Sequence, residues 1–135
     1  RAQAVPALWA AAGSPAPTSA ANPFTDVVSG AEYLNAVLWA VEQGITEGTS
    51  ATTFNPDQTV DRAQAVTFLW RMAGAPVSSA ANPFTDVAAG AYYADAAVWA
   101  VTAGVTAGNG ADTFGPAQNC PGAQIETMLA RYLGD

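Results

Sequence analysis

Arg62 is the residue whose type and position best suit binding chemistry in this chain of 135 residues. It directly follows Asp61 and falls in the first turn of an expected helix. A positive charge at the N-terminus of a helix is unfavourable by about 0.3–1 kcal/mol because of the helix dipole, so we expect Arg62 to have an acidic partner or ligand. A guanidinium fork meets a carboxylate through two parallel hydrogen bonds, which makes an acidic ligand one such partner. The other interpretation is a surface arginine paired with Asp61 or Asp57.

The charge balance restricts what else the chain binds. Four arginines, with no lysine and no histidine, oppose eleven acidic residues and give a formal net charge of −7. Because neutralising phosphate requires a basic surface, nucleic acids and anionic membranes are poor partners. An anion must therefore be met locally, by a placed arginine or by backbone amides. No apolar run approaches about 20 residues, so no membrane span is expected.

The chain is built from internal repeats. Asn22–Gly74 recurs as Asn82–Gly134 with a constant shift of 60 positions, 27 identities and no gap. The shared skeleton includes N-P-F-T-D-V, W-A-V, G-x-T-x-G, T-F-x-P and A-Q-x-x-T-x-L-x-R. Arg1–Gly13 is a partial copy of the last part, and linkers rich in Ala, Pro and Ser lie at 14–21 and 75–81. We therefore expect two and a half units of a repeat array that form one domain.

Each full unit is predicted to fold as a helix, a glycine-rich loop and a second helix. In residues 31–43 the apolar residues recur at the i, i+3, i+4, i+7 spacing of a helix lying on a core. The second helix is marked by Asp61 as N-cap and by Gln64 as its partner in a capping box. Phe54, between the helices, is expected to plug the loop onto them. This predicts an all-α fold with principal helices at about 2–12, 31–43, 62–73, 91–103 and 122–133.

No recognisable catalytic or metal-binding arrangement stands out in the sequence. The chain has no histidine, no lysine and only one cysteine, so it has no cysteine pair. Its acidic residues are scattered through the motifs, and the spacing of a calcium-binding loop is missing. The single cysteine, Cys120, stands where the other repeat has Val60, which predicts a small buried apolar side chain rather than a reactive thiol. We therefore expect a protein that is not an enzyme and that uses no metal or cofactor.

The period, content and order of the motifs resemble the S-layer homology (SLH) family. The family pattern is an aromatic-Asp-Val start, a helix, G-I-x-x-G, F-x-P and a T-R-A-E helix. In the first full repeat the matching segments are, in the same order, F-T-D-V, A-V-L-W-A-V-E-Q-G-I-T-E-G, T-F-N-P and D-R-A-Q-A-V-T-F-L-W-R. The resemblance covers the chain apart from its linkers. It implies units packed around a pseudo-threefold axis, with five of six main helices present and an open face for a preceding segment, a second chain or self-association.

The resemblance also implies a function. It implies that Arg62, in the T-R-A-E-like motif, grips an acidic glycan of the bacterial secondary cell wall, commonly a pyruvylated sugar. Loop backbone near Gly48 or Gly108 would lie beside the glycan, although a turn explains these two glycines equally well. Tyr92 would offer a surface on which a sugar stacks. Arg1 is the equivalent of Arg62 in the partial copy, where the groove is incomplete.

Departures from the family pattern leave a second function open. Gly122 replaces the arginine in the last unit, and Glu32 stands in the first full unit where Tyr92 stands in the second. With the missing helix and the absence of lysine, they favour a protein-interaction or self-assembly module, including a host-directed one. The glycan-binding anchor would be secreted and held at the bacterial cell surface or cell wall. The chain begins inside a motif without Met or a signal peptide, which predicts a piece of a longer protein.

Overall fold

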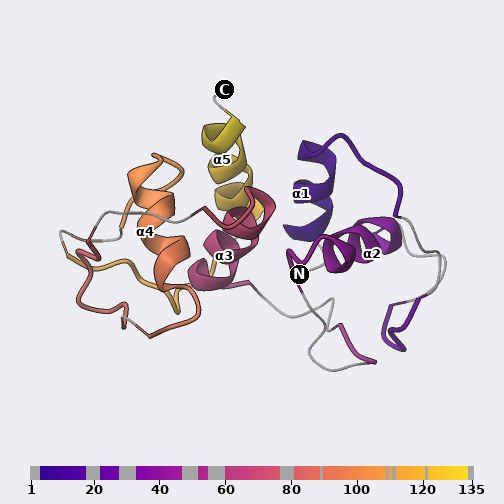
Figure 1. Cartoon of the computed structure of the whole chain (residues 1–135), viewed down its shortest axis with the longest axis horizontal. Helices are drawn as coiled ribbons and strands as arrows, with labels where there is room; N and C mark the ends of the chain where they lie inside the picture. Colours follow the sequence, from indigo (N-terminus) through magenta and orange to yellow (C-terminus); the bar gives the residue numbers. More distant parts are fainter. Residues whose placement is uncertain are drawn as a thin grey trace. The chain divides into compact units, whose positions relative to one another are not determined.

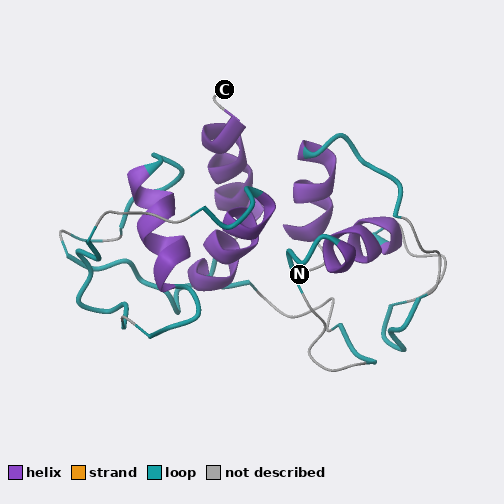
Figure 2. Cartoon of the chain, in the orientation of Figure 1, coloured by secondary structure: helices purple, strands orange, loops and turns teal. Residues whose placement is uncertain are grey.

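The structure of the chain is a computed structural model that describes residues 4–17, 22–27, 33–46, 52–54, 60–76, 81–88, 90–108, 110, 112–120 and 122–133. Within these ranges the chain is helical and has no β-strand, apart from one isolated bridge between Asp61 and Asn119 (Figure 2). The helices are α1 (Ala4–Ala11), α2 (Leu34–Glu42), α3 (Arg62–Met72), α4 (Ala94–Thr102) and α5 (Gly122–Leu133) (Figure 1). The prediction of an all-α fold with five principal helices is confirmed.

Two helices begin later than their apolar periodicity predicts. α2 and α4 start after residues 31 and 91, respectively, and follow Tyr33 and Tyr93. These tyrosines have φ of −90° and −100° with ψ of 3°, and neither side chain caps a backbone N–H. Residues 87–93 contain no Ser, Thr, Asp or Asn that could cap an earlier start of α4, and the chain makes a turn there instead, in which the Ala91 N–H donates to the Ala88 carbonyl at 3.0 Å.

α3 begins with the capping box that the sequence predicts. The Asp61 carboxylate accepts from the Gln64 N–H at 2.8 Å, and the Gln64 side chain accepts from the Asp61 N–H at 3.2 Å. After the helix, Gly74 has φ of +91°, a left-handed conformation in which glycine carries no Cβ penalty. Trp70 then donates its indole N–H to the Pro76 carbonyl at 2.8 Å, which ties the linker back to the last turn.

The chain divides into two compact units, Arg1–Thr59 and Val60–Asp135. α1 packs against α2 in the first unit, and α3 packs against α4 in the second. The division falls inside the first full repeat, in the loop before α3. Each unit therefore joins the second helix of one repeat to the first helix of the next. The packing of all five helices around a pseudo-threefold axis, and their assembly into one domain, remain predictions.

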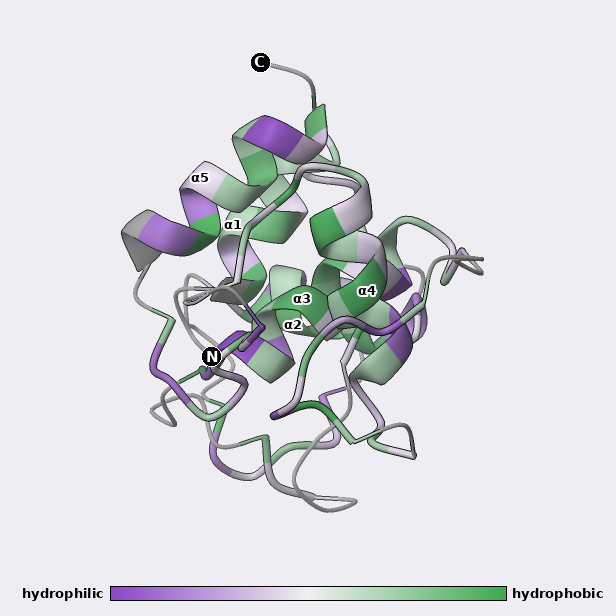
Figure 3. Cartoon of the chain, turned by 90° about the vertical axis from the view of Figure 1, so that its left-hand side faces the viewer, coloured by the Kyte–Doolittle hydropathy of each residue, from purple (hydrophilic) through white to green (hydrophobic). Residues whose placement is uncertain are grey.

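α5 is the amphipathic helix of the second unit. Hydrophilic and hydrophobic residues alternate along it, whereas α3 and α4 show longer hydrophobic stretches (Figure 3). Ile125 and Met128 are buried, and Glu126 and Arg131 are exposed. A helix with this pattern covers a core with one face and offers polar side chains on the other. The polar side of α5 is where the candidate site lies.

The N-P-F-T-D-V segment that opens each repeat folds into the same turn in both copies. In the first copy the Asn22 side chain accepts from the Phe24 N–H at 3.0 Å and donates to the Val27 carbonyl at 2.7 Å. Asn82 makes the equivalent bonds at 3.0 and 2.8 Å in the second copy. An asparagine that bonds its own backbone two residues on is a common way to fix a turn. Here it sets the position of the aspartate that follows.

That aspartate ties the opening of each repeat to its T-F-x-P segment. Asp26 accepts from the Phe54 N–H at 2.8 Å. Asp86 accepts at 2.8 Å from both the Phe114 N–H and the Gly115 N–H. Phe54 and Phe114 are fully buried, and each packs on the phenylalanine of the opening segment, with ring centroids 5.5 Å and 5.3 Å apart. Phe54 is thus the buried plug that the sequence predicts, and each aspartate accepts from the backbone of the T-F-x-P segment in its own repeat.

The hydrogen bonds to Asp86 predict a component of stability that acid removes. The Phe114 N–H, followed by the Gly115 N–H, lowers the pKa of the Asp86 carboxyl below its ordinary value of 3.8. Such a group contributes stability that is fully present above its unfolded pKa and is lost as pH falls through the lower, folded pKa. Below pH 3.8 we therefore expect the free energy of unfolding to fall less steeply in Asp86→Asn than in the wild type. Urea denaturation at a series of pH values measures this, and parallel curves would contradict it.

Candidate functional site

Arg62, the first residue of α3, is buried. Only 8% of its surface is exposed. Its Nε donates to the Phe114 carbonyl at 3.0 Å and its Nη2 donates to the Ala107 carbonyl at 2.6 Å. The guanidinium carbon lies 4.7 Å from the centre of the Phe114 ring, within the range of a cation–π contact. Arg62 is therefore not a surface arginine, because it fastens the loop between α4 and α5 to the start of α3. Asp57, proposed as one alternative partner, lies outside the described residues.

The charge of Arg62 is only partly balanced inside the protein. Burial lowers the pKa of the guanidinium because desolvation disfavours its charged form, and the Asp86 carboxylate acts in the opposite direction. Its Nε and Nη2 hydrogen bonds go to neutral carbonyl oxygens rather than to an acid. An anion that approached the guanidinium would therefore offset part of the desolvation. The surroundings of Arg62 favour an acidic ligand on electrostatic grounds.

The backbone N–H groups at the start of α3 are already occupied. The Arg62 N–H donates to the Gln118 carbonyl at 2.9 Å, and the Ala63 N–H donates to the Pro116 carbonyl at 3.0 Å. The Gln64 N–H is taken by the capping carboxylate. Free N–H groups at a helix N-terminus can bind an anion, but these three have protein partners. Any anion at this end of α3 must be recognised by side chains.

Cys120 lies beside this N-terminus as a structural residue. Its side chain is 4% exposed, and its N–H donates to the Val60 carbonyl at 2.8 Å. Burial raises the pKa of the thiol, which keeps the sulfur protonated at neutral pH. The prediction that Cys120 is a small buried apolar side chain is confirmed.

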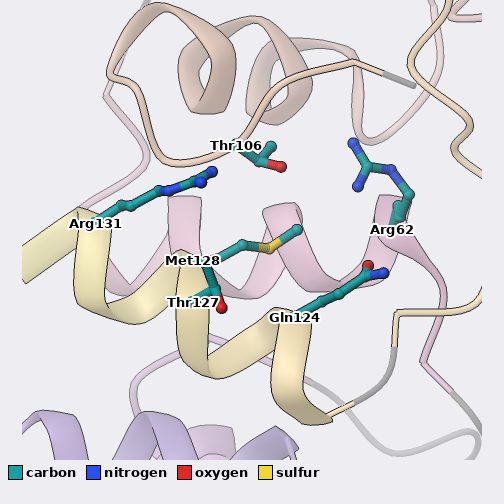
Figure 4. Close-up of a pocket in the computed structure, with 6 residues that line it drawn as sticks. All are labelled: Arg62, Thr106, Gln124, Thr127, Met128 and Arg131. Carbon is teal, nitrogen blue, oxygen red and sulfur yellow. The ribbon is translucent and has the colours of Figure 1, made fainter. Parts of the chain in front are cut away.

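A cleft of about 250 Å³ opens beside Arg62 in the second unit (Figure 4). Arg62 and Thr106 form part of its lining, and the remainder comes from one face of α5. The α5 residues are Gln124, Thr127, Met128 and Arg131. The side chains of Arg62 and Arg131 extend into the cleft from opposite ends, with Thr106 between them (Figure 4). Ligand pockets usually measure about 300–1,000 Å³, so this cleft suits a small acidic group better than a long chain.

Of the five predicted site residues, one lines the cleft, two are described but lie outside its lining, and two lie outside the described residues. Arg62 lines the cleft. Gly108 and Tyr92 are described but are not among the residues that line it. Arg1 and Gly48 lie outside the described residues, so their predicted roles stay predictions.

Gly108 has a packing role in the loop that Arg62 fastens. A Cβ at this position would overlap the Thr113 carbonyl oxygen and lie 3.0 Å from Cε1 of Phe84. The backbone therefore approaches its neighbours too closely for any other residue. Ala107, which accepts a hydrogen bond from Arg62, directly precedes this contact. Gly108 shapes the loop next to the site, and whether a ligand also touches it stays a prediction.

Gly108→Ala is expected to lower the free energy of unfolding by about 1–3 kcal/mol, since the added methyl group forces the loop away from Thr113. Urea denaturation followed by circular dichroism measures the change. Gly90→Ala is the matched control because a Cβ there meets nothing within 4 Å. Equal stabilities of the two variants would show that the loop accommodates the methyl group.

Tyr92 is the exposed aromatic residue for which the family resemblance implies sugar stacking. It is 59% exposed and packs edge-on against Tyr93, with ring centroids 5.0 Å apart. Partial burial raises the pKa of its hydroxyl, and the negative charge of Asp61 adds to this. Tyr92 therefore lies within electrostatic range of the start of α3. It has the exposure that stacking requires, without belonging to the cleft itself.

The sequence contained a signal for the cleft residues that were not predicted. Gln124, Thr127 and Arg131 are the fixed letters of A-Q-x-x-T-x-L-x-R, and Thr106 is the threonine of G-x-T-x-G. The three α5 residues are exposed. The repeat pattern marks these positions without assigning them a ligand, because their α3 counterparts are structural: Gln64 completes the capping box and Thr67 is buried.

Side chains that commonly bind metals are dispersed in the described ranges, where no group of three or more His, Cys, Asp and Glu residues could hold an ion. None of the helices in these ranges combines the length and the apolarity needed to cross a membrane.

Comparison with known proteins identifies the family. The sequence matches the S-layer homology domain over residues 23–66 and 83–124. It is 35% identical over 113 residues to an endoglucanase of Bacillus sp. strain KSM-635, covering 84% of this chain and 12% of that protein. It is 33% identical over 121 residues to a cell surface protein of Thermoanaerobacter kivui, covering 86% and 16%. An S-layer protein of Bacillus licheniformis is 29% identical over 119 residues, covering 87% and 14%.

The chain thus spans between 12% and 16% of the length of these relatives. No solved structure matches it. The two matched segments make up more than half of the chain and include Arg62, both N-P-F-T-D-V openings apart from the first asparagine of each, and both T-F-x-P segments. The chain belongs to the S-layer homology domain family.

Proposed function

We propose that this chain is a non-catalytic module that anchors a protein at the bacterial cell surface by binding an acidic secondary cell-wall polysaccharide. The observation that carries the proposal is the meeting of Arg62 and Arg131 at one cleft. The chain has only four basic residues and a formal charge of −7, so two arginines at one small site are a strong local exception. Such a site attracts an anion that the rest of the surface repels.

The relatives support an anchoring role. Proteins called a cell surface protein, an S-layer protein and an endoglucanase share this region while most of each protein lies outside it. A segment common to proteins with such different names is better explained by a shared attachment role than by a shared reaction. The same reasoning supports a bacterial cell-surface location, reached by secretion, for this chain.

The lining of the cleft supports a pyruvylated sugar as the ligand. A pyruvyl ketal carries a carboxylate and a methyl group on the same carbon. The arginines suit the carboxylate, whereas the buried thioether of Met128 offers an apolar contact for the methyl group. Thr106 and Gln124 supply hydroxyl and amide groups that can bond sugar hydroxyls. A uronic acid would satisfy the arginines but leave the apolar contact empty.

Sedimentation with purified cell walls tests the proposed function. We expect the protein to sediment with walls that carry a pyruvylated polysaccharide, and to stay in solution with walls from which that polysaccharide has been extracted. Walls of a strain that cannot attach pyruvate separate the acid from the sugar chain. Equal sedimentation with all three preparations, or with none, would overturn the proposal. Concentration-dependent association in analytical ultracentrifugation would then favour the self-assembly module, with a second chain or a further protein segment as partner.

A further inference from the structure

We infer that Arg131 and Arg62 together clamp one acidic group, which makes Arg131 a specificity-determining residue of the site. This inference rests on the proposed function. Arg131 belongs to the last turn of α5, and Arg62 begins α3. Their side chains enter the same cleft from opposite ends and flank Thr106 (Figure 4). A carboxylate beside Thr106 would present one oxygen to each guanidinium group.

The two arginines bring different properties to such a clamp. Arg62 is nearly buried and held by two carbonyl oxygens, so its position is fixed before a ligand arrives. These bonds use two of the five N–H donors of the guanidinium, which leaves others for a ligand. Arg131 is exposed, and in the described part of the chain no hydrogen bond or ion pair engages it. The fixed arginine sets the place of the acid, and the exposed one closes on it.

Arg71 occupies the same position in α3 that Arg131 occupies in α5, but it is not among the residues that line the cleft. It is the equivalent residue of α3, it also lies in the last turn, and it already has an interaction partner. A cation in the last turn is favoured by the helix dipole in both helices. That effect contributes to stability in both cases, but it predicts no contribution to ligand binding. Arg71 is therefore the matched control for Arg131.

Thr106 is the hydroxyl donor that the clamp requires between its two cations. Its hydroxyl lies 3.4 Å from the Ala107 carbonyl, which is at the long limit for a hydrogen bond. A carboxylate at this place would accept a stronger hydrogen bond from the Thr106 hydroxyl, and only this long bond to Ala107 would be lost. The site therefore selects a group that accepts from two guanidinium groups and one hydroxyl. A carboxylate meets that requirement, whereas an uncharged acetal of the same shape does not.

Calorimetry with a methyl glycoside that carries a pyruvyl ketal measures the contribution of Arg131. We expect Arg131→Ala to weaken binding about 10-fold, the lower end for a charge-assisted hydrogen bond, because Arg131 is exposed to solvent. Arg71→Ala should bind like the wild type. In a double-mutant cycle, Arg62→Ala with Arg131→Ala should lose less than the product of the single losses, since both grip the same group. The ethylidene analogue, which lacks the carboxylate, should not distinguish Arg131→Ala from the wild type.

The four arginines also allow a direct observation of the clamp. In a protein labelled with ¹⁵N, the Nε signals of Arg62 and Arg131 should shift together and with one dissociation constant when the pyruvylated glycoside is added, while the Arg71 signal stays in place. A shift of Arg62 alone, together with unchanged affinity of Arg131→Ala, would overturn the clamp and leave the proposed function standing. Absence of wild-type binding to both the glycoside and the cell walls would overturn both.

Discussion

Replacement of Phe114 by alanine is expected to lower the free energy of unfolding by about 3–5 kcal/mol. Phe114 is fully buried, and its ring packs on Phe84 with centroids 5.3 Å apart. The same ring lies under the guanidinium of Arg62, at 4.7 Å from its carbon. Truncation would therefore open a cavity and remove the surface on which the arginine rests. Urea denaturation followed by circular dichroism measures the change.

Two further variants serve as a comparison and a control for Phe114→Ala. Phe54→Ala should be destabilising by a similar amount, because Phe54 is equally buried and its ring packs on Phe24 at 5.5 Å. Tyr92→Ala should change the free energy of unfolding by less than about 0.5 kcal/mol, since Tyr92 is mostly exposed. If Phe114→Ala proved as stable as Tyr92→Ala, the loop would not be held by its apolar plug.

Arg62→Ala is expected to weaken binding of the pyruvylated glycoside by about 10–150-fold, the range for loss of one charge-assisted hydrogen bond. Arg62 is the fixed cation of the cleft, and without it the described lining holds no buried positive charge beside Thr106. The substitution also removes two hydrogen bonds to the loop, so it will lower stability as well. Calorimetry therefore has to be done at a temperature at which circular dichroism shows the variant to be folded.

Asp86→Asn separates the two effects of Arg62→Ala. This variant weakens the attachment of the same loop through Phe114 and Gly115 while leaving Arg62 in place. It should lose stability but keep most of its affinity, whereas Arg62→Ala should lose both. If Arg62→Ala retained wild-type affinity, the arginine would be a structural residue only, and the self-assembly module would be favoured.

The sequence predicted the helices well because the signals for them are local. Apolar periodicity predicted a helix at 31–43, the Asp61–Gln64 capping box predicted the start of α3, and the internal repeat placed the remaining helices. The starts of α2 and α4 were predicted too early, since apolar periodicity alone does not show where a helix begins, and neither Tyr33 nor Tyr93 caps its helix with its side chain. Helix boundaries depend on caps more than on apolar faces.

The site was predicted only in part because it is formed by contacts distant in the sequence. Arg62 was identified from its place next to a helix cap, but its burial comes from carbonyls 45 and 52 residues away. Arg131 was not among the predicted site residues, because nothing near it in the sequence shows that α5 faces the loop carrying Thr106. Such pairings follow from tertiary packing, and a single sequence shows them only through the letters that its repeats share.

The offset between the repeats and the compact units has a consequence for how such arrays evolve. Two helix pairs, α1 with α2 and α3 with α4, take their members from different repeats, although Trp99 of α4 also meets Tyr132 of α5 within the second repeat, with ring centroids 6.0 Å apart. Duplication or loss of one repeat by recombination in a linker would therefore give a helix a new packing partner. Neighbouring repeats are then under selection to stay compatible at this interface, so substitutions in the second helix of one repeat should be matched by substitutions in the first helix of the next. The boundary between the two compact units of this protein therefore falls within a repeat rather than between repeats.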